Sequence, residues 1–198
     1  IEEDYQNLIN LINQQNIQEN QYELKEILNL FAKIVKNHHR NNTFFYKIEK
    51  ILLYLKDSIK QYFVNSDIFN IFKSNKRILL FLLKKEIIVP NEYIIHTITQ
   101  EKYKKSNYLE YFYPEFSNHN LFKKTKIIED YETFNKKREI GENEDHICEL
   151  IRKDSIDEFI SYVNQNDINL GRKINKSIFE TNSFLIDKQP SFIEYAAF

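Results

Sequence analysis

Apolar residues recur at steps of three and four along the first 65 positions, which is the period of an amphipathic helix. Residues 22–37 carry one such stripe: Leu24, Ile27, Leu28, Phe31, Ile34 and Val35. Residues 44–63 carry another, behind Thr43 as a predicted cap: Phe45, Ile48, Leu52, Leu55, Ile59 and Tyr62. Residues 5–14 repeat the period more briefly. The pattern predicts three opening helices, each with one face to bury.

Two later stretches predict pairs of shorter helices joined by polar turns. In the first, "IFNIF" follows Ser66 or Asp67 as a cap, "KSN" interrupts the pattern, and "KRILLFLLKK" continues it. The second is "EDHICELIRKDSIDEFISYVNQ". Its residues predicted to face inward are Ile147, Leu150 and Ile151 on the first helix and Ile156, Phe159, Tyr162 and Val163 on the second. Helices joined by so short a turn must fold back on each other.

The remaining segments predict further helices broken at Pro114 and ended by Gly141, then a loop from Asn164. Within that region, "SIFETNSFLI" fits either a short helix or an extended segment. Pro190 and Ser191 then predict the start of a last helix. The fold class is therefore all-α. We divide the chain into an N-terminal helical cap at 1–65, helix pairs with inserted helices at 66–165, and a loop with the start of another unit at 166–198.

The two helix pairs share spacings with an ankyrin repeat, in which the second helix follows a tight turn at fixed offsets. With Asp154 in the turn, apolar residues follow at offsets of two, five, eight and nine, ending at Val163. With Ser74 in the turn, the matching residues are Ile78, Leu79, Leu82 and Leu83. "SFIEYAAF" resembles the opening of a further repeat, with Ile193 as its apolar anchor and Ala196 and Ala197 as its small pair.

Several features depart from a regular ankyrin array. The two turn positions are not glycine, the opener has Phe192 for proline and Glu194 for histidine, and the turns lie 80 residues apart. The spacing thus predicts a degenerate ankyrin-like helical solenoid built from antiparallel helix pairs, with an N-terminal helical cap.

A wider resemblance rests on the segments "KNHHRNNTFFYKIEKIL", "FNIFKSNKRILLFL", "YFYPEF", "GENEDHICELIRKDSIDEFISYVNQ", "SIFETNSFL" and "IEYAAF". Together they closely resemble the N-terminal ankyrin-like domain of unknown function of a large ankyrin-repeat family found in trichomonad protists. The resemblance covers essentially the whole chain. It implies a non-enzymatic protein-interaction role with longer arrays of repeats following, and it supplies no catalytic or cofactor residues.

The composition agrees with long helices, and the balanced charges create no strong electrostatic field. Two glycines and three prolines in 198 residues are too few for a turn-rich β fold. Lys plus Arg (28) nearly balance Asp plus Glu (29), so the net charge of −1 does not favour nucleic acid or acidic lipid. One cysteine permits no internal disulfide, and no apolar run approaches a membrane span. We expect an intracellular, cytoplasmic protein without a membrane segment.

The candidate chemical groups favour structural roles. His38 and His39 are adjacent and so diverge on a helix, while His96, His119 and His146 are scattered. Cys148 lies among inward positions and is expected to be a buried thiol. The carboxylate pairs are expected on solvated faces: Glu129 with Asp130, and Asp157 with Glu158. No glycine-rich phosphate loop or nucleophile motif is present, so we expect no enzyme, no cofactor and no metal.

The function predicted from these features is a protein–protein interaction scaffold, the N-terminal part of an ankyrin-repeat protein. Its expected partners are another protein and downstream repeats of the same chain, because the face begun by Ile193, Ala196 and Ala197 stops after about two turns. One alternative is nucleic-acid binding through residues 101–138, where nine Lys or Arg interleave with Tyr103, Tyr108, Tyr111 and Tyr113. Another alternative is an unrelated all-α enzyme that needs a metal or cofactor.

Overall fold

The structure is a computed structural model and describes residues 2–38, 40–100, 103, 106–117 and 130–197. Its helices pack against one another through their apolar faces. Within these ranges every regular element is a helix, apart from one isolated antiparallel bridge between Lys173 and Ser191. The all-α prediction is therefore confirmed. None of the described helices is long and apolar enough to cross a membrane.

Contacts divide the chain into two units, Ile1–Ile98 and Thr99–Phe198. The boundary falls inside the predicted 66–165 segment, so its two helix pairs belong to different units. The first unit contains α1 (Glu2–Gln14), η1 (Ile17–Glu19), α2 (Gln21–Asn37), α3 (Asn42–Tyr54), α4 (Lys56–Tyr62), α5 (Asn65–Phe72), α6 (Lys76–Lys84) and α7 (Glu92–Ile98).

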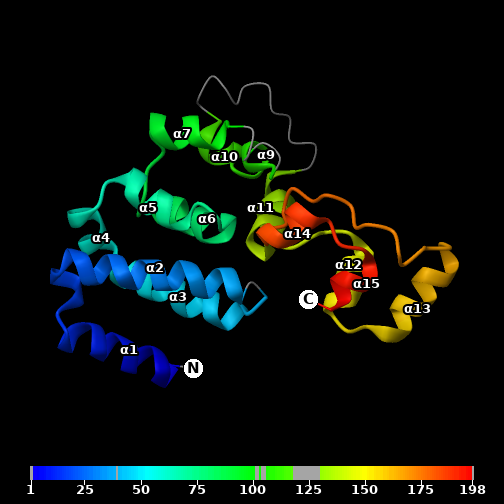
Figure 1. Cartoon of the computed structure of the whole chain (residues 1–198), viewed down its shortest axis with the longest axis horizontal. Helices are drawn as coiled ribbons and strands as arrows, with labels where there is room; N and C mark the ends of the chain where they lie inside the picture. Colours follow the sequence, from blue (N-terminus) through cyan, green and yellow to red (C-terminus); the bar gives the residue numbers. More distant parts are fainter. Residues whose placement is uncertain (1, 39, 101–102, 104–105, 118–129, 198) are drawn as a thin grey trace. The chain divides into compact units, whose positions relative to one another are not determined.

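In the first unit α2 packs against α3 and α5, and α6 contacts both α3 and α5 (Figure 1). The predicted stripes supply the buried faces. The buried stripe members are Leu24, Leu28, Phe31 and Val35 on α2 and Phe45, Ile48 and Leu52 on α3. Ile51 of α3 is also buried, although the predicted stripe did not include it. The amphipathic period thus located the core of this unit correctly.

Three local predictions in the first unit are wrong. α5 begins at Asn65, with Val64 at its N-cap position, so neither Ser66 nor Asp67 is its cap. The predicted helix over 44–63 is two helices, since the chain leaves helical geometry at Leu55, between α3 and α4. Its cap is Asn41 rather than Thr43, because the Asn41 side chain accepts the Phe44 amide at 3.1 Å. Thr43 instead lies in the first turn of α3.

The consecutive helices α5 and α6 contact each other. Ser74 does not adopt the left-handed backbone of an ankyrin turn. Asn75 is instead the N-cap of α6, and its side chain accepts the Ile78 amide at 2.9 Å. Of the predicted packing residues on α6, Leu83 is half-buried, whereas three are buried: Ile78, Leu79 and Leu82.

The second unit contains α9 (Tyr108–Tyr111), α10 (Tyr113–Phe116), α11 (Tyr131–Ile140), α12 (His146–Arg152), α13 (Ile156–Gln165), α14 (Ser183–Lys188) and α15 (Phe192–Ala196). Pro114 lies in the first turn of α10, so the chain breaks before it, at Phe112. Gly141 ends α11, as predicted, and its backbone there is left-handed. The weakly patterned region after α13 is largely loop, with α14 as its short helix.

Candidate functional site

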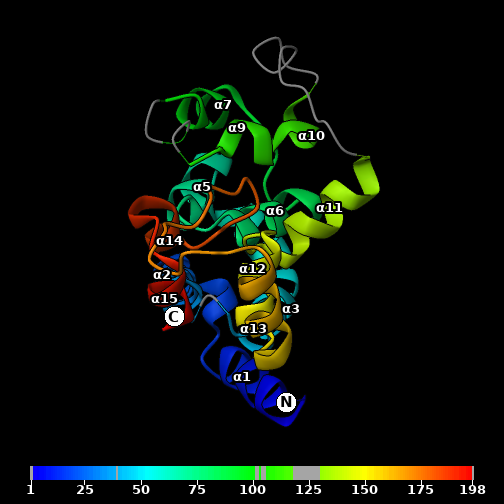
Figure 2. The same cartoon turned by 90° about the vertical axis from the view of Figure 1, so that its right-hand side faces the viewer.

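In the second unit α12 and α13 form a helical hairpin, with the two helices in contact (Figure 2). Asp154, with φ of 52°, is left-handed in the turn between the two helices. The Asp154 amide donates to the Ile151 carbonyl at 3.2 Å, and the Ser155 amide donates to the Leu150 carbonyl at 3.1 Å. These two bonds form the helix ending in which glycine is the usual left-handed residue. Asp154 therefore takes the turn position that the spacing predicted.

The short helix α15 packs against α12. Ser191 begins it, as predicted, in a capping box with Glu194. The buried residues of α15 are Phe192 and Tyr195, which join one core cluster with Ile147 and Cys148 of α12. α15 is thus anchored by its two aromatic residues rather than by Ile193.

Arg152 ties three segments together at this contact. Its Nη1 donates to the Tyr195 hydroxyl at 2.7 Å, and its Nε lies 2.5 Å from a carboxylate oxygen of Glu142. Burial raises the pKa of Tyr195 to about 12, although the Arg152 charge opposes that shift. The Tyr195 hydroxyl is therefore an uncharged acceptor for Arg152 at neutral pH.

The predicted packing residues of this unit divide into three groups. Ile147 and Leu150 are buried. Half-buried residues packed against the core cluster include Ile151, Phe159, Tyr162 and Val163. Ile156 is 61% exposed, so the prediction that it faces inward is wrong. On α13 the covered side is centred on Phe159, Tyr162 and Val163, and Ile156 lies at the edge of that arc.

The predicted small-residue face of α15 is also open. Ile193 is 63% exposed, and Ala196 and Ala197 are exposed. The covered residues Phe192 and Tyr195 lie on the opposite side of the helix from Ile193. The expectation that Ile193, Ala196 and Ala197 pack against another helix stays a prediction.

An open apolar groove of about 360 Å³ lies beside α13. Its apolar lining consists of Leu150, Ile151, Ile156, Phe159, Ile160 and Ala196, and its polar lining of Asp154 and Ser155. Within this lining Ile156 is 61% exposed and Ile160 is 51% exposed. Exposed, clustered apolar surface of this kind is typical of an interaction site.

Comparisons with protein-family models, curated proteins and solved structures found no match. The groove and the hairpin must therefore be interpreted from their own geometry.

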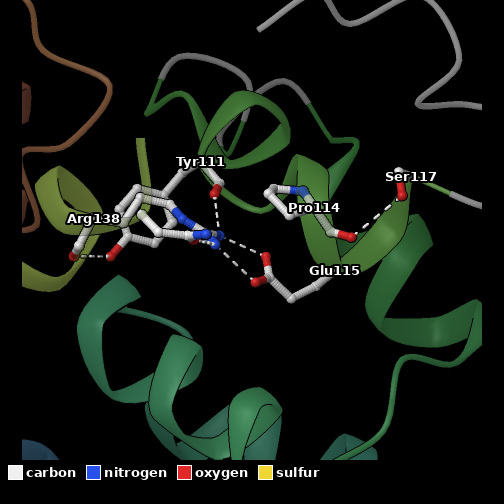
Figure 3. Close-up of polar contacts among 6 residues, drawn as sticks. Tyr111, Pro114, Glu115, Ser117 and Arg138 are labelled. Atoms are coloured by element: carbon white, nitrogen blue, oxygen red, sulfur yellow. Dashed lines mark hydrogen bonds and ion pairs between the residues drawn. The ribbon is translucent and has the colours of Figure 1, made fainter. Parts of the chain in front are cut away.

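The feature that the sequence did not reveal is a buried arginine. Arg138 of α11 is fully buried and forms a bidentate ion pair with Glu115 of α10, at 2.6 and 3.0 Å (Figure 3). Its Nη1 also donates to the Tyr111 carbonyl at 2.8 Å, and the Tyr111 hydroxyl donates back to the Arg138 carbonyl at 2.9 Å. These contacts fasten α9, α10 and α11 together.

The contacts of Arg138 with Glu115 and Tyr111 weaken the interpretation of residues 101–138 as a basic, aromatic segment that binds nucleic acid. Arg138, counted among its cations, is covered and neutralised by Glu115. Tyr103, Tyr108 and Tyr111 are buried, and Tyr113 is half-buried. Stacking on nucleic-acid bases requires exposed ring faces. The three buried tyrosines are therefore not a stacking platform, and residues 118–129 of the segment lie outside the described residues.

The groups considered for catalysis or metal binding do not converge in the described part of the chain, where no cluster suited to a metal ion is found. Cys148 is buried, as predicted. His38, His96 and His146 are exposed, while His39 and His119 lie outside the described residues. Asp157 and Glu158 are exposed as expected.

Of the other carboxylate pair, Glu129 also lies outside the described residues. Asp130 caps α11, and its hydrogen bonds with Thr133 lower the pKa of its carboxyl.

Proposed function

We propose that this chain is a non-enzymatic scaffold for protein–protein interaction and forms the N-terminal part of an ankyrin-repeat protein. The observation that carries the proposal is the arrangement of α12, α13 and α15. The α12–α13 hairpin has a left-handed turn, and its first helix, α12, packs against α15. α15 begins with a capping box, as the first helix of a further repeat would. Neighbouring units of a solenoid bury their apolar flanks in this manner.

The groove beside α13 supports an interaction role. Its lining is mostly apolar, and two of the lining isoleucines, Ile156 and Ile160, are exposed. A scaffold needs such a face, since each unit of a repeat array is completed by its neighbour or partner. Further repeats of the same chain and another protein are the partners that we propose.

Affinity capture tests this proposal. The purified chain would be immobilised beside two variants, Ile160→Asp at the groove and Leu53→Asp on the first unit, where Leu53 is 47% exposed. We expect the natural chain and Leu53→Asp to retain the same protein, whose binding is then measured directly with purified material. Retention of nucleic acid with steep salt dependence, and of no protein, would contradict the scaffold role.

A further inference from the structure

We propose that the groove beside α13 holds an amphipathic α-helix from the unit that follows α15 in the same chain, and that Lys or Arg borders the apolar stripe of this helix. The inference rests on the proposed function and deepens it by naming what occupies the groove.

The position of the occupant follows from the existing hairpin. α12 is followed, after a turn of three residues, by α13, which packs on it. α15 packs against α12, so a helix joined to α15 by a similar turn would lie along α13. The groove lies in that place, because α13 supplies Phe159 and Ile160 to its lining and α15 supplies Ala196. The geometry of one pair therefore indicates where the second helix of the next pair lies.

The form of the apolar surface favours a helix over a small molecule. Two isoleucines of the groove lining, Ile156 and Ile160, lie one helical turn apart on α13 and are exposed. A small apolar ligand is normally enclosed on most sides. An amphipathic helix instead lays side chains spaced three and four residues apart along such a strip. The spacing of Ile156 and Ile160 thus matches the period of a helix laid along α13.

The charges around the groove indicate which residues border the apolar stripe of that helix. Asp154 is the one charged residue in the lining, and Asp157 and Glu158 follow it as exposed carboxylates in the first turn of α13. The basic residues that precede them are already engaged. Lys153 pairs with Glu149 at 2.7 Å, and Arg152 is held by Glu142 and Tyr195. An acidic edge beside an apolar groove attracts a helix whose stripe is flanked by Lys or Arg.

Peptide binding to the purified 198-residue chain tests the occupant's chemistry. Two synthetic helical peptides would share one apolar stripe, and the border positions would be Lys in one and Glu in the other. At low salt the Lys peptide should bind about three- to tenfold more tightly, and the difference should shrink as salt rises. Equal binding of both peptides, or no binding of either, would overturn the inference.

Variants assign the binding to this groove. Ile160→Asp should abolish binding of the Lys peptide, whereas Leu53→Asp should leave it unchanged. The pair Asp154→Asn and Asp157→Asn should remove most of the preference for Lys, and asparagine still tolerates the left-handed backbone at residue 154. Binding that survives Ile160→Asp would place the peptide elsewhere and overturn the inference.

The source of the helix is tested with a longer natural chain that includes residues after Phe198. That chain should not bind the Lys peptide, because its own helix already fills the groove. Peptide binding as tight as that of the 198-residue chain would overturn the proposed source. So would dimerisation of the 198-residue chain that Ile160→Asp abolishes. If the peptides fail while a captured protein is still retained, the inference falls and the scaffold role stands.

Discussion

Arg138 and Glu115 form a buried ion pair in which two guanidinium nitrogens face both carboxylate oxygens and no part of the arginine side chain is exposed. The Arg138 guanidinium also lies near the rings of Tyr111 and Phe134, at 5.8 and 5.2 Å from their centroids. A paired charge in such surroundings depends strongly on its partner, because desolvation of a lone ion is costly.

Removal of one member of this pair should destabilise the second unit. Glu115→Leu leaves the Arg138 charge buried without its carboxylate, and we expect unfolding free energy to fall by about 3–5 kcal/mol. Urea melts followed by circular dichroism measure the change. The double variant Glu115→Leu with Arg138→Met should recover much of the loss, since no buried charge remains. Equal losses in the single and double variants would show that the ion pair is not the cause.

Asp154→Gly should stabilise the α12–α13 hairpin. Asp154 adopts a φ of 52°, which glycine accepts without the clash of a Cβ atom. The expected gain is about 1 kcal/mol in unfolding free energy, partly offset by the greater freedom of glycine in the unfolded chain. Asp154→Asn serves as the matched control, since it removes the charge but keeps a side chain. A loss of stability in Asp154→Gly would mean that the carboxylate, rather than the backbone, matters at this turn.

Replacement of the left-handed glycine at the end of α11 should have the opposite effect on stability. Gly141 has a φ of 72°, and a Cβ atom added there would meet the Thr181 methyl group at 3.1 Å. The Gly141 carbonyl also accepts the amide and hydroxyl of Thr181, at 3.1 and 2.8 Å. Gly141→Ala should therefore lower unfolding free energy by about 1–2 kcal/mol. The same urea melts would contradict this if the variant were as stable as the natural chain.

The residues predicted correctly from sequence are those whose environment is local. The period of three and four located the buried faces of α2 and α3, and the spacing after Asp154 located the α13 turn. Side chains whose burial depends on distant segments were missed. Arg138 is covered because Glu115, 23 positions earlier, is brought to it. Ile156 was expected to be buried but is exposed, because the side of α13 that contacts its neighbours is narrower than the apolar side of the helix.

Packing in the first unit gives a graded prediction. Leu82 is fully buried on α6, so Leu82→Ala should cost about 2–5 kcal/mol of unfolding free energy. Phe159 of the second unit is only half-buried, and its truncation should cost less. Leu53→Ala, on the exposed side of α3, should change stability by less than about 0.5 kcal/mol. Urea melts in which Leu82→Ala resembles Leu53→Ala would contradict the assignment of Leu82 to the core.

The capping box of α15 should make that helix sensitive to acid. The Glu194 carboxylate accepts the Ser191 amide at 2.7 Å, and this hydrogen bond lowers the pKa of the Glu194 carboxyl below its usual value of 4.5. A carboxyl whose pKa is lower in the folded state stabilises the fold above its unfolded pKa. Its contribution is therefore present at neutral pH and is lost as pH falls through the folded pKa, in the range below about 4.5.

Amide hydrogen exchange of residues 192–197, measured from pH 6 to pH 3 and corrected for intrinsic exchange rates, reports this loss directly. In the natural chain, protection of α15 should fall more steeply than that of α12, on which it packs. Glu194→Gln keeps a hydrogen-bonding oxygen but cannot titrate, so its α15 should lose the extra pH dependence while keeping part of its protection. If α15 in Glu194→Gln responded to acid as steeply as in the natural chain, another group would have to control the start of this helix.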